Sequence, residues 1–195
     1  RAINTGDPTL FWEEHNYYFT NTTFKKFLKN SGYKIVFYRK FLDSLENCLV
    51  VILQKSSFQY KIINNNQYKN QIELYSSKLQ KRYFATNLFF LNLSKKGNIA
   101  IYGASHLTVT FISVMNLAKY ISIVIDDDRN KENLLLPTGD LPIVPLNKIN
   151  NNDIKYFFLG LNPNHHDIVN KKINRIYPLS KVYSIFPNTN LFYDK

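Results

Sequence analysis

The stretch Asn98-Ile99-Ala100-Ile101-Tyr102-Gly103-Ala104-Ser105 decides the fold of this 195-residue chain. A short apolar strand pattern runs directly into a turn of small residues, and residues 106–119 then read as a largely apolar helix. The same order returns downstream, with strand patterns at 120–125 and 155–161 and a helix pattern at about 165–175. Strands that alternate with helices form a parallel sheet through right-handed crossovers. This part of the chain therefore predicts an α/β fold with a Rossmann-like parallel sheet.

A long helix and a helix-strand-strand pattern precede the α/β part. No Gly or Pro interrupts residues 68–93, where apolar residues recur at roughly helical spacing, and Gly97 follows as a helix stop. We expect one long connecting helix here, or two shorter ones. Further upstream, residues 20–23 offer N-caps for a short helix, which is followed by strand patterns at 33–41 and 48–53.

The chain is basic, and its charge is uneven. The net charge is +11, and residues 1–97 hold 15 basic and six acidic side chains, against ten and eight in the remainder. A basic half can bind nucleic acid by neutralising phosphates. The lysines are scattered, however, and no nucleic-acid motif is present, so we expect a solvated basic face and no nucleic-acid partner. No apolar stretch is long enough to span a membrane, and we expect no membrane partner.

Cysteine usage narrows the setting further. Cys48 is the single cysteine, which excludes an intrachain disulfide framework and a zinc site built on paired cysteines. Because Cys48 opens an apolar run, we expect a buried strand thiol. A reducing, cytoplasmic location is the default expectation.

The turn at Gly103 is the first candidate site. A turn of small residues that opens a helix after a parallel strand offers backbone N–H groups to a phosphate. Asp126 follows Gly103 by 23 positions, near the spacing at which a second-strand acid meets a ribose hydroxyl. Ser105 and Thr108, however, stand where a dinucleotide fingerprint carries Gly. Three readings stay open: an NAD site, a phosphate or nucleotide-sugar contact, and a purely structural turn.

The histidines give a second candidate. His15 lies in Phe11-Trp12-Glu13-Glu14-His15-Asn16-Tyr17-Tyr18-Phe19-Thr20, where neighbouring carboxylates could orient an imidazole that exchanges protons near neutral pH. The alternative is a packed histidine in an aromatic stretch. His106 could contact a phosphate or cap its helix. His165-His166-Asp167 lacks further metal ligands in the sequence around it, and we expect a solvated helix end there.

Motifs in both halves of the chain resemble the C-methyltransferases of deoxysugar biosynthesis. In this family, a methyltransferase domain is followed by a distinctive C-terminal α/β domain. The N-terminal part is similar to the family's Glu-His-x-x-Tyr-Phe-Thr segment, and the C-terminal part to its Tyr-Gly-Ala turn, Asp-Asp strand end, Pro-Gly-x-x-Ile-Pro-Ile loop and Trp-Asn pair. The corresponding stretches are Glu14–Thr20, Tyr102–Ala104, Asp126–Asp128, Leu136–Ile143 and Leu161-Asn162.

The resemblance implies transfer of a methyl group from S-adenosylmethionine to a ring carbon of a nucleotide-linked keto sugar. It implies His15 as the base that removes the α proton, or as its near neighbour, with Glu14 as the orienting or charge-balancing partner. The nucleotide-sugar would be held partly by the C-terminal domain, where Asp126 could meet a hydroxyl or only cap the next turn. The other candidate substrate contacts are Tyr17, Tyr18, Tyr102, Gly103, Ser105 and Asn162.

The resemblance also implies a division of the chain. Residues 1–57 would finish a catalytic domain, residues 58–97 would connect, and residues 98–195 would form the substrate-holding domain. S-adenosylmethionine would bind mainly to a region upstream, so we expect this chain alone to be inactive. A nucleotide-sugar-binding or scaffold module without catalysis is the alternative, and an NAD-linked oxidoreductase is a third possibility.

Overall fold

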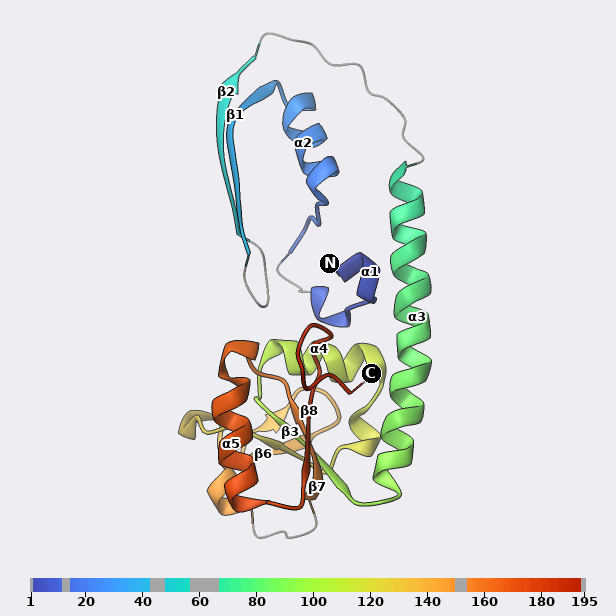
Figure 1. Ribbon diagram of the computed structural model, residues 1–195, viewed down its shortest axis with the longest axis vertical. Helices are drawn as coiled ribbons and strands as arrows, with labels where there is room; N and C mark the ends of the chain where they lie inside the picture. The colour runs from blue at the N-terminus through green and yellow to red at the C-terminus, as the bar shows by residue number, and fades with distance from the viewer. Residues whose placement is uncertain (1, 12–14, 43–47, 57–66, 150–153, 194–195) are drawn as a thin grey trace. The chain divides into compact units, whose positions relative to one another are not determined.

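The computed structural model describes residues 2–11, 15–42, 48–56, 67–149 and 154–193 (Figure 1). The chain divides into two compact units. One combines Arg1–Trp12 with Tyr75–Lys195, and the other comprises Glu13–Leu74. We call them the α/β unit and the hairpin unit and describe each by itself.

The α/β unit is built on a six-stranded sheet with the strand order β5-β6-β4-β3-β7-β8. All neighbouring strands are parallel except β5, which pairs antiparallel with β6. The central strand β3 pairs with β4 on one side and with β7 on the other. The predicted α/β fold with a parallel sheet is confirmed. The strands are β3 (Asn98–Tyr102), β4 (Ile123–Ile125), β5 (Leu135–Leu136), β6 (Leu141–Val144), β7 (Ile154–Leu159) and β8 (Lys181–Ser184).

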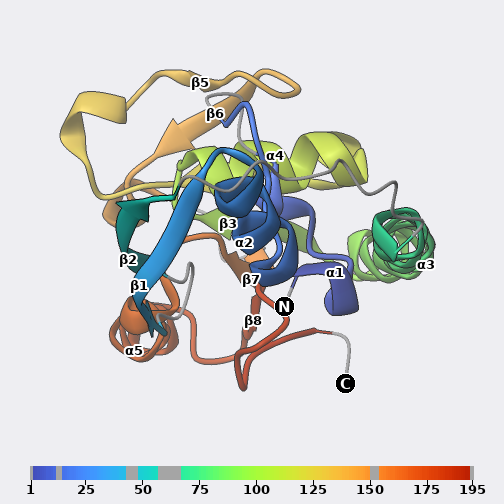
Figure 2. The same cartoon turned by 90° about the horizontal axis from the view of Figure 1, so that it is seen from above.

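Helices cover both faces of this sheet. On one face, Phe90 of α3 (Gln67–Ser94) packs against Phe111 of α4 (His106–Met115) and against Phe158 of β7. On the other face, Ile173 of α5 (His166–Ile176) joins the core cluster that contains Phe157. Successive residues of β7, such as Phe157 and Phe158, thus point to opposite layers, as strand geometry requires. Figure 2 shows α4 and α5 on opposite sides of the strands.

Several boundaries differ from the sequence prediction. The helix predicted over 106–119 ends at Met115, because Asn116 adopts a left-handed conformation (φ 54°) that stops a helix. A short 3-10 helix over Ala118–Tyr120 follows, so β4 begins at Ile123 and not at residue 120. Leu141–Val144, expected within a loop, forms β6 beside β4. Strands β5 and β8 were not predicted.

The N-terminal residues belong to the α/β unit. Helix α1 (Ala2–Thr5) and the 3-10 helix η1 (Pro8–Leu10) flank a buried stretch formed by Gly6, Asp7 and Pro8. The η1 turn packs against α4. This short segment therefore folds with residues far along the chain.

The hairpin unit contains the predicted helix-strand-strand elements. Helix α2 (Asn21–Asn30) starts at Thr20, whose hydroxyl accepts from the Thr23 amide in a capping box. β1 (Tyr33–Phe41) and β2 (Cys48–Lys55) form an antiparallel hairpin. The prediction that Cys48 is a buried strand thiol is wrong, because Cys48 is exposed at the start of β2.

Within the connecting segment, Gln67–Ser94 form one continuous helix, α3, and its first eight residues belong to the hairpin unit. Among the residues that the structure describes, no helix combines the length and the apolar character needed to cross a membrane.

Candidate functional site

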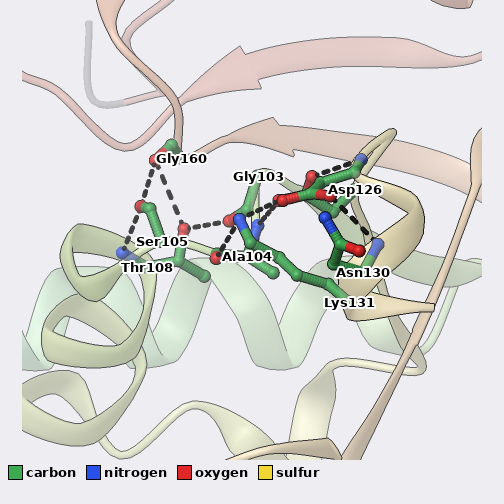
Figure 3. Close-up of polar contacts among 9 residues, drawn as sticks. Gly103, Ala104, Ser105, Thr108, Asp126, Asn130, Lys131 and Gly160 are labelled. Atoms are coloured by element: carbon green, nitrogen blue, oxygen red, sulfur yellow. Dashed lines mark hydrogen bonds and ion pairs between the residues drawn. The ribbon is translucent and has the colours of Figure 1, made fainter. Parts of the chain in front are cut away.

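The candidate site lies at the carboxyl ends of β3, β4 and β7. The chain leaves β3 toward β4 on one side and later returns to β7 on the other, which makes this edge the topological switch point of the sheet. Open parallel sheets bind ligands at such points. Figure 3 shows the polar contacts around the turn that follows β3.

Gly103 forms the turn and requires the absence of a side chain. Its φ is +107°, and a Cβ there would lie 3.1 Å from the amide nitrogen of Leu161. A Cβ on Gly160 would meet the Thr108 hydroxyl at 2.1 Å. The turn after β3 and the end of β7 therefore approach more closely than bulkier residues would allow.

Two hydroxyls hold this close approach in place (Figure 3). Thr108 Oγ1 donates to the Gly103 carbonyl at 2.5 Å, with the Gly160 carbonyl at 3.3 Å. Ser105 Oγ donates to the Gly160 carbonyl at 3.0 Å and accepts from the Thr108 amide. Ser105 and Thr108, which replace the glycines of a dinucleotide fingerprint, thus serve as hydrogen-bonding anchors of the turn.

Asp126 is engaged by the protein on both of its carboxylate oxygens. Its Oδ2 accepts from the Ala104 amide at 2.8 Å and from Lys131 Nζ at 3.0 Å, and its Oδ1 accepts from the Asp128 amide at 2.9 Å. Lys131 also donates to the Ala104 carbonyl. The bond from the Asp128 amide agrees with the expectation that Asp126 caps the next turn. The bond from the Ala104 amide occupies a donor that a phosphate at this turn would otherwise bind.

Tyr102, Asp127 and Lys172 form a second cluster at the same edge. Tyr102 Oη donates to Asp127 Oδ2 at 2.5 Å, and Lys172 Nζ of α5 donates to the same oxygen at 2.6 Å. Lys172 Nζ also lies 3.3 Å from the Tyr102 hydroxyl. The Asp127 side chain is 50% exposed, whereas Tyr102 is only 4% exposed. No described residue donates a hydrogen bond to Asp127 Oδ1.

The contacts in this cluster set the protonation states of Tyr102 and Asp127. Burial, reinforced by the hydrogen bond to Asp127 and the charges of Asp127 and Asp126, raises the pKa of Tyr102 well above its ordinary value, so the phenol stays a donor. Burial alone would raise the pKa of Asp127, but the hydrogen bonds from Lys172 and Tyr102 outweigh it and lower that pKa. Asp127 is therefore an ionised acceptor near neutral pH.

The loop after β7 carries Asn162, whose Oδ1 accepts from the Asn164 amide and caps a 3-10 helix over Pro163–His165. His166 follows and is 4% exposed, so the prediction of a solvated helix end is wrong at this residue. Its Nε2 lies 3.0 Å from the Leu161 carbonyl, to which it donates. His166 thereby fixes the loop that contains Asn162.

His15, Tyr17 and Tyr18 belong to the hairpin unit, and all three are exposed. The His15 ring lies edge-on to the Tyr18 ring at 5.8 Å, and the Tyr17 ring stacks on Phe19 at 6.3 Å. Glu14 lies outside the described residues. The assigned roles of these residues stay predictions.

The structure gathers five predicted site residues at one sheet edge and adds others that the sequence did not single out. The five are Tyr102, Gly103, Ser105, Asp126 and Asn162. Asp127 could have been found from the acidic run that ends β4, and Gly160 from its position after β7. Lys172 gave no signal, because it stands 45 residues after Asp127 on a solvated helix.

Fold and site together define a doubly wound α/β domain with a polar site at the carboxyl ends of its central strands. Residues 62–180 match the C-methyltransferase C-terminal domain family, and the chain therefore belongs to that family. The predicted C-terminal portion of a C-methyltransferase is thereby confirmed. No curated protein matches the chain.

Proposed function

We propose that this chain is the C-terminal part of an S-adenosylmethionine-dependent C-methyltransferase that acts on a nucleotide-linked keto sugar in the cytoplasm. Its α/β unit helps to hold the nucleotide-sugar. The role of the α/β unit in holding the nucleotide-sugar rests on the Tyr102–Asp127–Lys172 cluster. This cluster presents an ionised carboxylate oxygen at the switch point of the sheet. The family match supports the proposal that the chain is part of a C-methyltransferase.

Asp127 is the acid best placed to bind a hydroxyl of the substrate. A sugar or ribose hydroxyl needs an acceptor that the protein leaves open. Both carboxylate oxygens of Asp126 already accept hydrogen bonds, from Ala104, Asp128 and Lys131. Within the part of the chain that the structure describes, Asp127 is bonded only through Oδ2, which accepts from Tyr102 and Lys172, so its carboxylate is oriented before a ligand arrives.

The remaining candidates divide between contact and support. Gly103 lets the turn lie close to the end of β7, and Ser105 ties the two together. Asn162 stands at the same end of the sheet, on the loop that His166 fixes. Tyr102 supports the site by orienting Asp127 through its hydroxyl, since its own ring is buried.

His15 is the proposed base, with Glu14 as its charge-balancing partner and Tyr17 and Tyr18 as walls of the pocket. A carbon beside a ketone is a weak nucleophile until its α proton is removed, and imidazole exchanges protons near neutral pH. S-adenosylmethionine would supply the methyl group. We assign its binding mainly to a region upstream of this chain, as the resemblance implies.

The division into residues 1–57, 58–97 and 98–195 stays a proposal, and the hairpin unit supports only the part of it that assigns the helix-strand-strand elements to a catalytic domain. Ile52 and Leu53 are neighbours in β2 and point to opposite faces of the hairpin, yet both are exposed. Apolar residues on both faces are typical of strands inside a sheet that is covered on both sides. The rest of a catalytic domain would supply that cover, and a binding module without catalysis would not need it.

The α/β unit can be tested directly by calorimetry of the 195-residue chain with UDP-glucose and dTDP-glucose. We expect saturable binding that Asp127→Asn weakens at least roughly fivefold, as loss of a charged acceptor would. Asp140→Asn removes an exposed carboxylate on another loop and serves as the matched control. Absence of binding, or equal effects of the two variants, would contradict the proposed role. Binding of NAD instead would favour the oxidoreductase.

The catalytic assignment requires the full-length protein. We expect His15→Ala to slow methyl transfer at least roughly tenfold and to leave the affinity for S-adenosylmethionine nearly unchanged, because a lost base affects the chemical step. An unaltered rate would remove His15 from the mechanism.

A further inference from the structure

Residues 2–11 form a segment that is anchored in the α/β unit, although the residues that follow belong to the hairpin unit. We call residues 6–11 the anchor segment. Gly6 sits directly on the backbone of α3, since a Cβ on Gly6 would lie 2.5 Å from the carbonyl carbon of Lys78 and 2.6 Å from the Leu79 nitrogen. Its φ is +60°, which side-chain-bearing residues rarely adopt. Only glycine fits this contact without displacing the segment.

A buried ion pair holds the next residue. Asp7 and Arg82 of α3 are 5% and 6% exposed, and Asp7 Oδ1 lies 3.9 Å from Arg82 Nη1. Arg82 Nη2 donates to the Ile185 carbonyl at 2.8 Å, and the guanidinium lies over the Phe192 ring. Arg82 thus ties the anchor segment to the C-terminal end of the same unit. Removing one charge of such a pair leaves the other buried without a counter-ion.

Further contacts fix the segment up to its last residue. The Tyr75 hydroxyl donates to the Asp7 carbonyl at 2.8 Å, and the Tyr75 ring packs edge-on against Phe11. Thr110 Oγ1 of α4 donates to the Phe11 carbonyl at 3.4 Å. Asp7 also caps η1 through Thr9, whose amide and hydroxyl both donate to Asp7 Oδ1. The segment is therefore held by side chains of both α3 and α4.

The anchored end lies four residues before His15 in the sequence. Four residues span at most about 14 Å, so the chain keeps the His15 backbone within that reach of Phe11. Catalysis depends on holding a base to within a fraction of an ångström, and a misplacement of about 1 Å can lower a rate roughly a hundredfold. An anchor of this kind would limit the positions of a base that sits on an exposed stretch.

We propose that Gly6, Asp7 and Arg82 are positioning residues for the methyl transfer: they anchor the segment that leads to His15. This inference rests on the proposed function of His15. Gly6, Asp7 and Arg82 act through the main chain of the anchor segment. Their loss lowers kcat, and it leaves KM for the nucleotide-sugar nearly unchanged because the cluster around Asp127 is intact.

The test compares three variants of the full-length protein. Gly6→Ala and Asp7→Asn disturb the anchor segment and keep the Arg82–Ile185 bond, and Tyr75→Phe removes one hydrogen bond as a milder change. Lys69→Met, which breaks an exposed ion pair with Glu73 on the same helix, is the control. The readouts are amide hydrogen exchange of residues 2–11, kcat, and KM.

We expect Gly6→Ala and Asp7→Asn to speed exchange over residues 2–11 at least roughly tenfold and to lower kcat at least roughly tenfold, with KM changed less than about twofold. Tyr75→Phe should give smaller changes in the same direction, and Lys69→Met none. Unchanged exchange overturns the anchor, and faster exchange with an unchanged kcat overturns the positioning role. A wild-type protein that transfers no methyl group overturns the proposed function instead, while its exchange data still report on the anchor.

Discussion

Strands β7 and β2 are both largely apolar in sequence, but β7 is buried and β2 is exposed. β7 reads Ile-Lys-Tyr-Phe-Phe-Leu and is buried at every position except Lys155. β2 begins with six consecutive apolar residues, and seven of its eight residues are exposed. α3 and α4 cover one face of β7 and α5 covers the other. An apolar run therefore predicts a strand, whereas the burial of that strand depends on the layers packed against it.

The largest expected effect tests this comparison directly. Phe158→Ala should lower the free energy of unfolding by about 3–5 kcal/mol, because it removes a fully buried ring and leaves a cavity between α3 and the sheet. Ile52→Ala in β2 should lower it by less than about 1 kcal/mol, since that side chain is already in water. Guanidinium denaturation of the 195-residue chain measures both. Equal losses would show that the hairpin is covered in solution.

Much of the fold followed from periodicity in the sequence. The order of β3, α4, β4, β7 and α5 was predicted because strand and helix patterns alternate there with clear turns. β6 was missed because Pro142 and the preceding Gly139 suggest a loop, and the short β5 and β8 give too few residues for a period. The place of Gly6 and Asp7 in the α/β unit could not be predicted, because their partners on α3 lie some 70 residues away.

The candidate site was predicted in outline and corrected in its contacts. The strand ends located the turn at Gly103 and the acidic run, since carboxyl ends of parallel strands share one edge. Which acid faces outward was not predictable, because neighbouring residues such as Asp126 and Asp127 differ only in the partners that folding brings to them. Asp126 accepts hydrogen bonds from Ala104 and Lys131. Asp127 accepts them from Tyr102 and Lys172.

A smaller effect is expected where the α/β unit satisfies a buried hydroxyl. Thr108→Val keeps the shape of the side chain and deletes its bonds to the Gly103 and Gly160 carbonyls. We expect a loss of about 1–3 kcal/mol in the free energy of unfolding. Thr22→Val, at an exposed position of α2 in the hairpin unit, is the matched control and should change stability by less than about 0.5 kcal/mol. A loss below that of Thr22→Val would mean that water replaces both bonds.

The buried His166 of α5 gives the α/β unit a small dependence of its stability on pH. Burial lowers the pKa of His166 below its ordinary value of 6.5, and the bond to the Leu161 carbonyl and the Asp167 charge offset this only in part. Its Nε2 donates to Leu161, so a second proton would enter at Nδ1, which is buried without a partner in the described structure. The neutral ring is therefore favoured in the folded state.

The stability that His166 contributes is fully present above pH 6.5 and is lost as the pH falls through the lowered pKa of the folded state. We expect the free energy of unfolding to decrease between about pH 7.5 and about pH 5.5, by at most about 1.4 kcal/mol per pH unit for one proton. His166→Gln keeps a donor for Leu161 and cannot titrate, so it should flatten this slope. His165→Gln, at the exposed neighbour, should retain most of it. A slope that survives in His166→Gln would assign the pH dependence to other groups, and the buried ring would then be only a packing residue of the α/β unit.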